Sequence, residues 1–235
     1  WVAYPLCYDH TNGSGRSDQW AYDPDVPSDK QTNCRSGAYG VYLDTENYTN
    51  NYYARGHQIA NADRNGVDAM CDQTYYMTNI LPMVSNFNGG IWQNMEDQLR
   101  AWCGDFNSSR WSGSLFDTLY VCKGGTIDKA EQILTYTVDQ VDVNGEAAPH
   151  PGKHIVPKYF FIALLAKKGS TYRAIGFWAE HVAESHKGEP LGGYVKSIRE
   201  LEQLTGIDFF CNLPDDIEER VETMTAEKMK ELWNL

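Results

Sequence analysis

A single amphipathic stretch, from Gly90 to Cys103, most constrains how this chain can fold. Its apolar residues recur at steps of three, four, three and one, the spacing that lines one face of a helix. These residues are Trp92, Met95, Leu99, Trp102 and Cys103. A helix with one apolar face has to bury that face against other elements. Because most of the remaining segments are extended in character, the pattern predicts an α+β fold, a central twisted antiparallel sheet flanked by helices.

Extended segments are predicted on both sides of this helix, from alternating or β-branched and aromatic residues. They are Trp1–Cys7, Tyr52–His57, Tyr75–Thr78, Leu115–Val121, Ile133–Val143, Ile155–Ala166 and Tyr172–His181. Asn144-Gly145 and Lys168-Gly169 are candidate turns. The region Tyr8–Asn51 has a loop composition. Helical spacing returns in Val195–Leu204, which stops at Gly206, and again near Thr225–Trp233.

The size and charge of the chain limit its function class. With 235 residues, 42% of them hydrophobic, and no internal repeat, we expect one globular domain over residues 1–235. No apolar run is long enough to cross a membrane. The formal net charge of −12 argues against a protein that coats nucleic acid with a broad basic surface. It does not exclude an enzyme that holds phosphate in a small cationic cleft.

Several features favour an exported protein. The chain starts at Trp1 without an initiator methionine, a basic segment or an apolar signal segment, so we expect that any targeting peptide is removed or missing. Seven tryptophans, fifteen tyrosines and Asn-x-Ser/Thr triplets at Asn12, Asn47 and Asn107 suit export. We therefore predict a secreted protein, or one of the periplasm or cell envelope.

Six cysteines are scattered along the chain without a C-x-x-C pair, which argues against structural zinc. Some of them could form disulfides in an exported protein. Each could equally be a small buried apolar residue.

His57 is the first candidate for chemistry, and it stands in the segment Ala54-Arg55-Gly56-His57-Gln58. A lone histidine is most often a buried residue that the backbone satisfies. Here Gly56 would let a bulky ligand approach the backbone, and Arg55 offers a planar fork suited to phosphate. A neutral imidazole at this place can accept a proton.

Two asparagines and a charged pair extend the set of candidates. Asn79 follows the strand predicted at Tyr75–Thr78, and Asn88 precedes the predicted helix, so each could simply be a turn or cap residue. A side-chain carbonyl at a helix start can also face a magnesium ion that keeps most of its waters. Glu96 and Arg100, four residues apart, emerge on the same side of the helix.

Taken together, these motifs resemble the active-site signature of the DNA/RNA non-specific endonuclease family. The resemblance is carried by Arg55-Gly56-His57, Thr78-Asn79 with Pro82, Asn88 with Gly90 and Trp92, and Glu96 with Arg100. Trp1–Tyr4, Val156–Phe160 and Ile198–Phe210 resemble further segments of the family, in the family's order and over nearly the whole length. The resemblance implies a ββα-metal (His-Me) finger at the active site.

The metal site is implied by the resemblance. Asn88 would be the single direct protein ligand of a hydrated Mg²⁺, for which Mn²⁺ could substitute. Glu96 would hold the metal's waters from a second layer. The substrates would be DNA and RNA, with little preference for sequence.

The other roles are implied in the same way. His57 would be the general base that deprotonates the attacking water, and Asn79 would orient His57 or the metal waters. Arg55 and Arg100 would face the phosphate. The resemblance is compatible with a monomer or homodimer and with a protein inhibitor as partner.

The chain departs from the family at Ala54, where many members carry an aspartate immediately before Arg-Gly-His. We expect reduced activity rather than none, and a nearby acid such as Asp63 could substitute. A nuclease fold that has lost turnover and only binds nucleic acid or protein is the first alternative. An exported carbohydrate-binding or adhesion domain is the second, motivated by the aromatic residues and the sheet.

Overall fold

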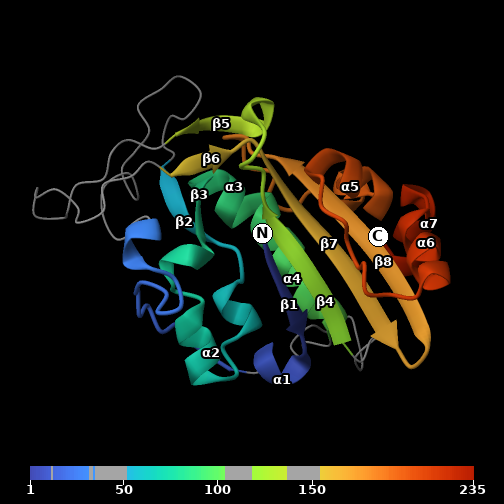
Figure 1. Ribbon diagram of the computed structural model, residues 1–235, viewed down its shortest axis with the longest axis horizontal. Helices are drawn as coiled ribbons and strands as arrows, with labels where there is room; N and C mark the ends of the chain where they lie inside the picture. Colours follow the sequence, from blue (N-terminus) through green and yellow to red (C-terminus); the bar gives the residue numbers. More distant parts are fainter. Residues whose placement is uncertain (12, 32–33, 35–51, 104–117, 137–153) are drawn as a thin grey trace, which may run out of the picture.

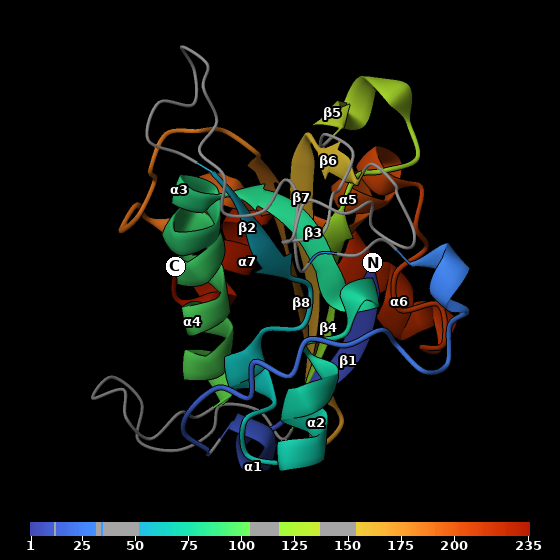
Figure 2. The same cartoon turned by 90° about the vertical axis from the view of Figure 1, so that its left-hand side faces the viewer.

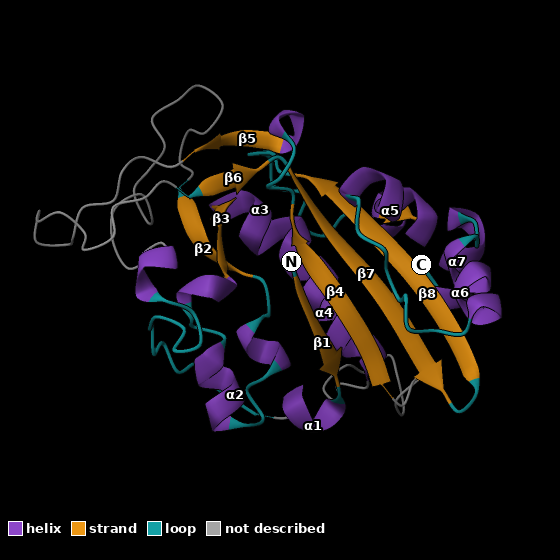
Figure 3. Ribbon diagram, in the orientation of Figure 1, coloured by secondary structure: helices purple, strands orange, loops and turns teal. Residues whose placement is uncertain are grey.

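A five-stranded antiparallel sheet forms the centre of the computed structural model, which describes residues 1–11, 13–31, 34, 52–103, 118–136 and 154–235 (Figures 1 and 3). The strand order is β1-β4-β7-β8-β9. The strands are β1 (Val2–Leu6), β4 (Thr118–Gly125), β7 (Tyr159–Lys168), β8 (Thr171–Glu180) and β9 (Val195–Lys196). Two smaller antiparallel pairs join β2 (Tyr53–His57) to β3 (Ile80–Val84) and β5 (Ile133–Tyr136) to β6 (Ile155–Pro157).

Helices cover both faces of the central sheet, which Figure 2 shows nearly edge-on. α4 (Gln93–Cys103) and α7 (Ala226–Trp233) lie on one side, where Trp102 and Trp233 meet with their ring centroids 4.5 Å apart. α5 (Ile198–Thr205) and α6 (Asp215–Glu222) lie on the other. The shorter helices are α1 (Tyr8–Thr11), α2 (Asp68–Gln73) and α3 (Ser85–Phe87). The predicted α+β class is therefore confirmed.

Strands β2 and β3 with helix α4 form the ββα unit that the sequence motifs indicated. His57, at the end of β2, pairs with Ile80 at the start of β3, and α4 follows β3 through α3 and a wide turn. Gly56 serves the pairing of the strands rather than the approach of a ligand. A Cβ at this position would lie 2.4 Å from the Met83 side chain and 2.8 Å from the carbonyl oxygen of Leu81.

The connection into β3 differs from the sequence prediction. The expected strand Tyr75–Thr78 is wrong, because Met77–Asn79 form a short helical turn, η3, and the strand begins at Ile80. Pro82 fits inside this strand because β2 and β3 form a sheet of only two strands, so one side of β3 needs no ladder donors. Asn79 therefore precedes a strand instead of following one.

Other strands and helices also begin or end at residues that differ from the prediction. The predicted strand Ile155–Ala166 is split at Lys158, with β6 and β7 in different sheets. The strand predicted to end at Val121 continues to Gly125. The helix expected from Val195 begins at Ile198 after a capping box, and α2 and α6 were not predicted.

Some predictions were confirmed. The opening strand, the strand that ends at His57, the turn at Lys168-Gly169 and the last helix lie where the sequence indicated. Gly206 ends α5 with φ of 74°, a left-handed cap that favours glycine. The glycosylation triplets, the turn Asn144-Gly145 and the predicted strand residues 115–117 and 137–143 lie outside the described residues.

All six cysteines are described, and no disulfide joins any two of them. Cys34, Cys71 and Cys103 are buried, which agrees with the alternative of small buried apolar residues. None of the helices in the described ranges combines the length and the apolar character that crossing a bilayer requires.

His181 joins the ββα unit to the central sheet. Its buried Nε2 accepts a hydrogen bond from the Val84 N–H at 2.7 Å, and its Nδ1–H donates to the Pro157 carbonyl at 2.8 Å. The rings of Phe87 and Phe160 pack edge-on against the imidazole. Burial lowers the pKa of His181 to about 4, against the opposing effect of the Pro157 carbonyl. A neutral imidazole thus links β3, β6 and the end of β8.

We predict that His181→Ala lowers the free energy of unfolding by about 3 kcal/mol, because two buried backbone groups lose their partner and a cavity forms. The wild-type protein should also lose stability as the pH falls from 6.5 towards 4, because the unfolded His181 binds a proton that the folded one does not. The slope from this residue is about 1.4 kcal/mol per pH unit. Urea unfolding at pH 7 and pH 5 measures both effects. His186→Ala on the following loop is the control, and an equal loss in both variants would contradict the prediction.

Candidate active site

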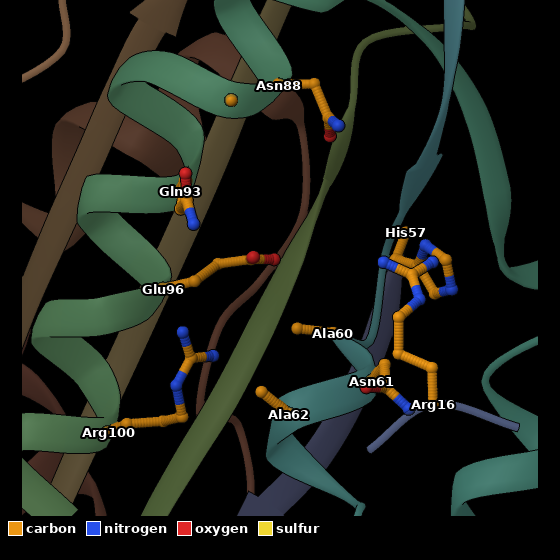
Figure 4. Close-up of a pocket in the computed structure, with 10 residues that line it drawn as sticks. Arg16, His57, Ala60, Asn61, Ala62, Asn88, Gln93, Glu96 and Arg100 are labelled. Carbon is orange, nitrogen blue, oxygen red and sulfur yellow. The ribbon is translucent and has the colours of Figure 1, made fainter. Parts of the chain in front are cut away.

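A polar cleft of about 270 Å³ separates α4 and the turn before it from the chain that follows β2 (Figure 4). Four of the six predicted site residues line it: His57, Asn88, Glu96 and Arg100. Arg55 and Asn79 do not. The remaining lining residues are Arg16, Ala60, Asn61, Ala62, Gly89 and Gln93.

His57 presents one free ring nitrogen. Its Nδ1 lies 3.3 Å from the carbonyl oxygen of Arg55, a contact that requires the proton on Nδ1. Nε2 is buried and has no hydrogen-bond partner among the described residues. The rings of Tyr75 and Trp20 pack against the imidazole, with centroids 5.2 and 5.6 Å away. The ring is therefore held with an unprotonated nitrogen available.

The charge state of His57 follows from its surroundings. Burial is the largest cause that lowers its pKa, to about 4, and the Arg16 guanidinium lowers it further. The hydrogen bond to Arg55 opposes this shift without overcoming it. The imidazole is therefore neutral at pH 7 and able to accept a proton.

Asn88 is placed by an irregular entry into α4. Residues Asn88–Trp92 form a wide helical turn, η4, in which Gly90 has φ −109° and ψ −114°, outside the helical region. This kink aims the Asn88 amide into the cleft from above α4 (Figure 4).

Glu96 reaches into the same space from the first turn of α4. Its Oε1 accepts a hydrogen bond from Nζ of Lys123 at 2.7 Å, and Lys123 is completely buried. Burial raises the pKa of Glu96, and the Lys123 ammonium works in the opposite direction.

Arg100 lines the cleft but is bound to carboxylates. Its Nη1 donates to Oδ1 of Asp63 at 2.8 Å, and Nη2 contacts Asp97. Burial disfavours its charge, but Asp63 and Glu96 outweigh burial and raise its pKa. The hydroxyl of Tyr4 donates to the other oxygen of Asp63 at 2.6 Å. Because Asp63 is buried with both oxygens engaged, it does not replace a carboxylate at position 54.

Arg55 does not line the cleft, so its contact with the phosphate stays a prediction. Its Nε donates to the carbonyl oxygen of Cys34, and its guanidinium stacks over the Trp20 ring at 5.2 Å. A planar cation over a partly buried indole ring gains from that contact, so the side chain lies along Trp20 and not in the cleft. Ala54, one residue earlier in β2, emerges on the face opposite His57.

Asn79 acts on the backbone. Its Oδ1 accepts from the Ile59 N–H at 2.8 Å, and its Nδ2 donates to the carbonyls of Ile59 and Thr74. The amide therefore holds the chain two residues beyond His57. This arrangement supports an indirect role in orienting His57, while contact with metal waters stays a prediction.

The sequence analysis missed Arg16, Asn61, Gln93 and Lys123. Arg16 lies beside His57 (Figure 4), with its guanidinium 5.8 Å from the centre of the Tyr75 ring. No local pattern marks it, because it lies in a loop far from the motifs. Gln93 was detectable in principle, since it precedes Glu96 by almost one helical turn.

The oxygen donors in the cleft fit a hard cation that keeps most of its waters. Asn88, Gln93 and Glu96 all project from one side of the cleft and offer amide or carboxylate oxygens. Among the described residues, three carboxylates come within 4.8 Å of one another only at Glu202, Asp208 and Glu222, which lie outside the cleft. A few oxygens without a full cage of carboxylates are the usual setting for Mg²⁺.

We predict that Asp63→Ala lowers the free energy of unfolding by about 3–5 kcal/mol, because it leaves the guanidinium of Arg100 unpaired in a buried setting. Asp97→Ala removes the exposed partner of the same arginine and should cost at most about 1 kcal/mol. Urea unfolding of both variants measures these two losses of free energy. Equal effects would show that Arg100 does not depend on Asp63.

Similar proteins are found by both sequence and structure. A nuclease of Nostoc sp. is 26% identical over 232 residues, covering 95% of this chain and 70% of that protein. A nuclease of Serratia marcescens is 25% identical over 224 residues, covering 93% and 70%. A chain in the crystal structure of the EndoG/EndoGI complex shares the fold, with TM-score 0.63 at 17% identity over 91% of this chain and 79% of that one. The model of the DNA/RNA non-specific endonuclease family matches residues 1–216, so the chain belongs to this family.

Proposed function

We propose that the chain is a Mg²⁺-dependent endonuclease that hydrolyses phosphodiester bonds of both DNA and RNA, without preference for sequence or sugar. One observation carries this proposal: a neutral histidine with an unpartnered Nε2 shares a small cleft with the oxygen donors Asn88 and Glu96. The family membership supports hydrolysis of nucleic acid as the reaction.

His57 would act on the nucleophile. Its Nε2 takes a proton from a water molecule as the water oxygen bonds to phosphorus and the bond from phosphorus to the leaving oxygen breaks. The contact of Nδ1 with the Arg55 carbonyl keeps the lone pair on Nε2 and stabilises the imidazolium that forms. Such proton transfer typically contributes about 10²–10⁴-fold to the rate.

Asn88 would hold the cation directly and Glu96 would hold it through water. When bound, Mg²⁺ would supply positive charge to the phosphate and the leaving oxygen. Arg16, beside His57, would contact a phosphate oxygen, and its ion pair with Asp18, at 3.6 Å, is exposed. Arg100 adds charge to the lower part of the cleft, although Asp63 and Asp97 partly neutralise it.

Recognition of the nucleic-acid backbone would leave the enzyme without a preference for sequence. The cleft is small and lined by charged and amide side chains suited to phosphate and sugar, contacts that carry no sequence information. Binding through phosphates should weaken as salt rises.

A protein inhibitor is a reasonable partner, because the similar EndoG chain was crystallised in complex with EndoGI. Export and a monomeric or dimeric state stay predictions. Loss of turnover through Ala54 is less well supported, because this side chain emerges opposite His57.

We predict that the purified chain cleaves supercoiled plasmid and RNA in millimolar Mg²⁺, and that chelator abolishes both activities. His57→Ala should lower the rate about 10²–10⁴-fold while the unfolding curve stays that of a folded protein. Gel assays with both substrates measure this, with the variant prepared in parallel to exclude a contaminating nuclease. Cleavage that survives in the variant, or a wild-type chain inactive with Mg²⁺ and Mn²⁺, would refute the proposal.

The acid limb of the pH profile gives a second prediction. Since protonated His57 cannot accept a proton, kcat/KM for a single-stranded RNA should fall as the pH drops through about 4, and not through 6.5. Arg16→Gln removes a positive charge that lowers the pKa of His57, so it should shift this limb to higher pH. A wild-type limb near 6.5 would mean that the buried, neutral His57 is not the base.

A further inference from the structure

Lys123 is a charged residue in the apolar face of the central sheet. In β4 the buried positions Leu119, Val121 and Lys123 alternate with more exposed ones, so Lys123 points towards α4. Its side chain is 0% exposed, whereas lysine is almost never fully buried without a partner.

Within the described part of the chain, the ammonium of Lys123 has one acidic partner. Nζ lies 2.7 Å from Oε1 of Glu96 and sits over the rings of Trp92 and Tyr4, at 5.2 and 5.9 Å from their centres. Both rings attract the cation but accept no ionic bond in place of the carboxylate. The ammonium of Lys123 is therefore held towards the Glu96 carboxylate.

Burying the Lys123–Glu96 pair costs desolvation free energy, and the stability of the fold does not by itself explain why the pair is there. Removing an ion from water costs several kcal/mol even after relaxation, and a pair of apolar residues of similar volume often stabilises a protein as well or better. Lys123 also comes from the interior of the sheet, where it pairs in register with Val2 on β1 and Ile162 on β7. The backbone of Lys123 is therefore held by strands on both sides.

The partner of Lys123 is a residue of the cleft. Because Nζ engages Oε1, Oε2 is the Glu96 oxygen without a hydrogen bond from the described residues, and the carboxylate projects into the cleft (Figure 4). We propose that Lys123 is a positioning residue of the active site, which orients Glu96 from behind so that Oε2 holds a water of the bound cation. This inference rests on the proposed function.

The test uses Lys123→Met, Lys123→Gln, Glu96→Gln and the double variant Lys123→Met/Glu96→Gln. Binding of Mn²⁺, followed by the loss of its free EPR signal, is the first readout, and kcat/KM on RNA is the second. Lys123→Met and Glu96→Gln should each weaken Mn²⁺ binding about 10–100-fold, the usual effect of removing a partner behind the metal ligands. Lys123→Gln should lose less Mn²⁺ affinity, because its amide can still donate to Oε1.

The double variant should bind Mn²⁺ no more weakly than Glu96→Gln alone, because Lys123 acts through Glu96.

Lys167→Met, a partly exposed lysine on the neighbouring strand β7, is the matched control and should bind Mn²⁺ like the wild type. Folded Lys123 variants with wild-type Mn²⁺ affinity would overturn the inference, as would a double variant clearly weaker than Glu96→Gln. It would also fall if neither single variant folded while the double variant did, since Lys123 would then serve folding only. A wild-type chain that neither binds Mn²⁺ nor cleaves RNA would refute the proposed function and this inference together. If the wild-type chain binds Mn²⁺ and cleaves RNA but the Lys123 variants keep its Mn²⁺ affinity, only the inference is refuted.

Discussion

The burial of charge between α4 and the central sheet is the constraint on which the site depends. Lys123 with Glu96, and Arg100 with Asp63, lie within a contact that is otherwise made of aromatic and aliphatic side chains. Since unpaired charges in such a place cost several kcal/mol, each pair must keep its geometry for the protein to stay folded. Glu96 of α4 is thus tied to the central sheet through Lys123, and Arg100 to the short turn that carries Asp63.

The same burial sets the proton affinities that chemistry needs. His57 is kept neutral by desolvation and by the charge of Arg16, and its two neighbouring rings leave Nε2 without a protein partner among the described residues. On the opposite side of the cleft, Glu96 is buried as well, but Lys123 offsets the effect of burial on its carboxyl. One cleft therefore holds a neutral base and a paired acid a short way apart, an arrangement that surface residues would not provide.

His181 shows how a second histidine serves structure alone. It has the same depressed pKa as His57, but both of its ring nitrogens bond to the backbone, and it joins three strands instead of facing the cleft. The pKa shift of a histidine does not separate the two roles. What separates them is that Nε2 of His57 has no partner among the described residues, and that His57 lines a cleft with oxygen donors.

The sequence by itself determined the fold class, the amphipathic helix and the order of His57, Asn88, Glu96 and Arg100, because periodicity and spacing are local properties. The tertiary structure decided which of the candidates share a cleft. Arg55 stacks on Trp20, and Asn79 bonds to the backbone. Asp63 is bound by Arg100 and Tyr4. All of these contacts join residues that are far apart in the chain. Arg16 and Lys123 entered the site for the same reason. A loop arginine carries no local signal, and a lysine beyond the predicted end of a strand gains its meaning only when that strand pairs and α4 covers it.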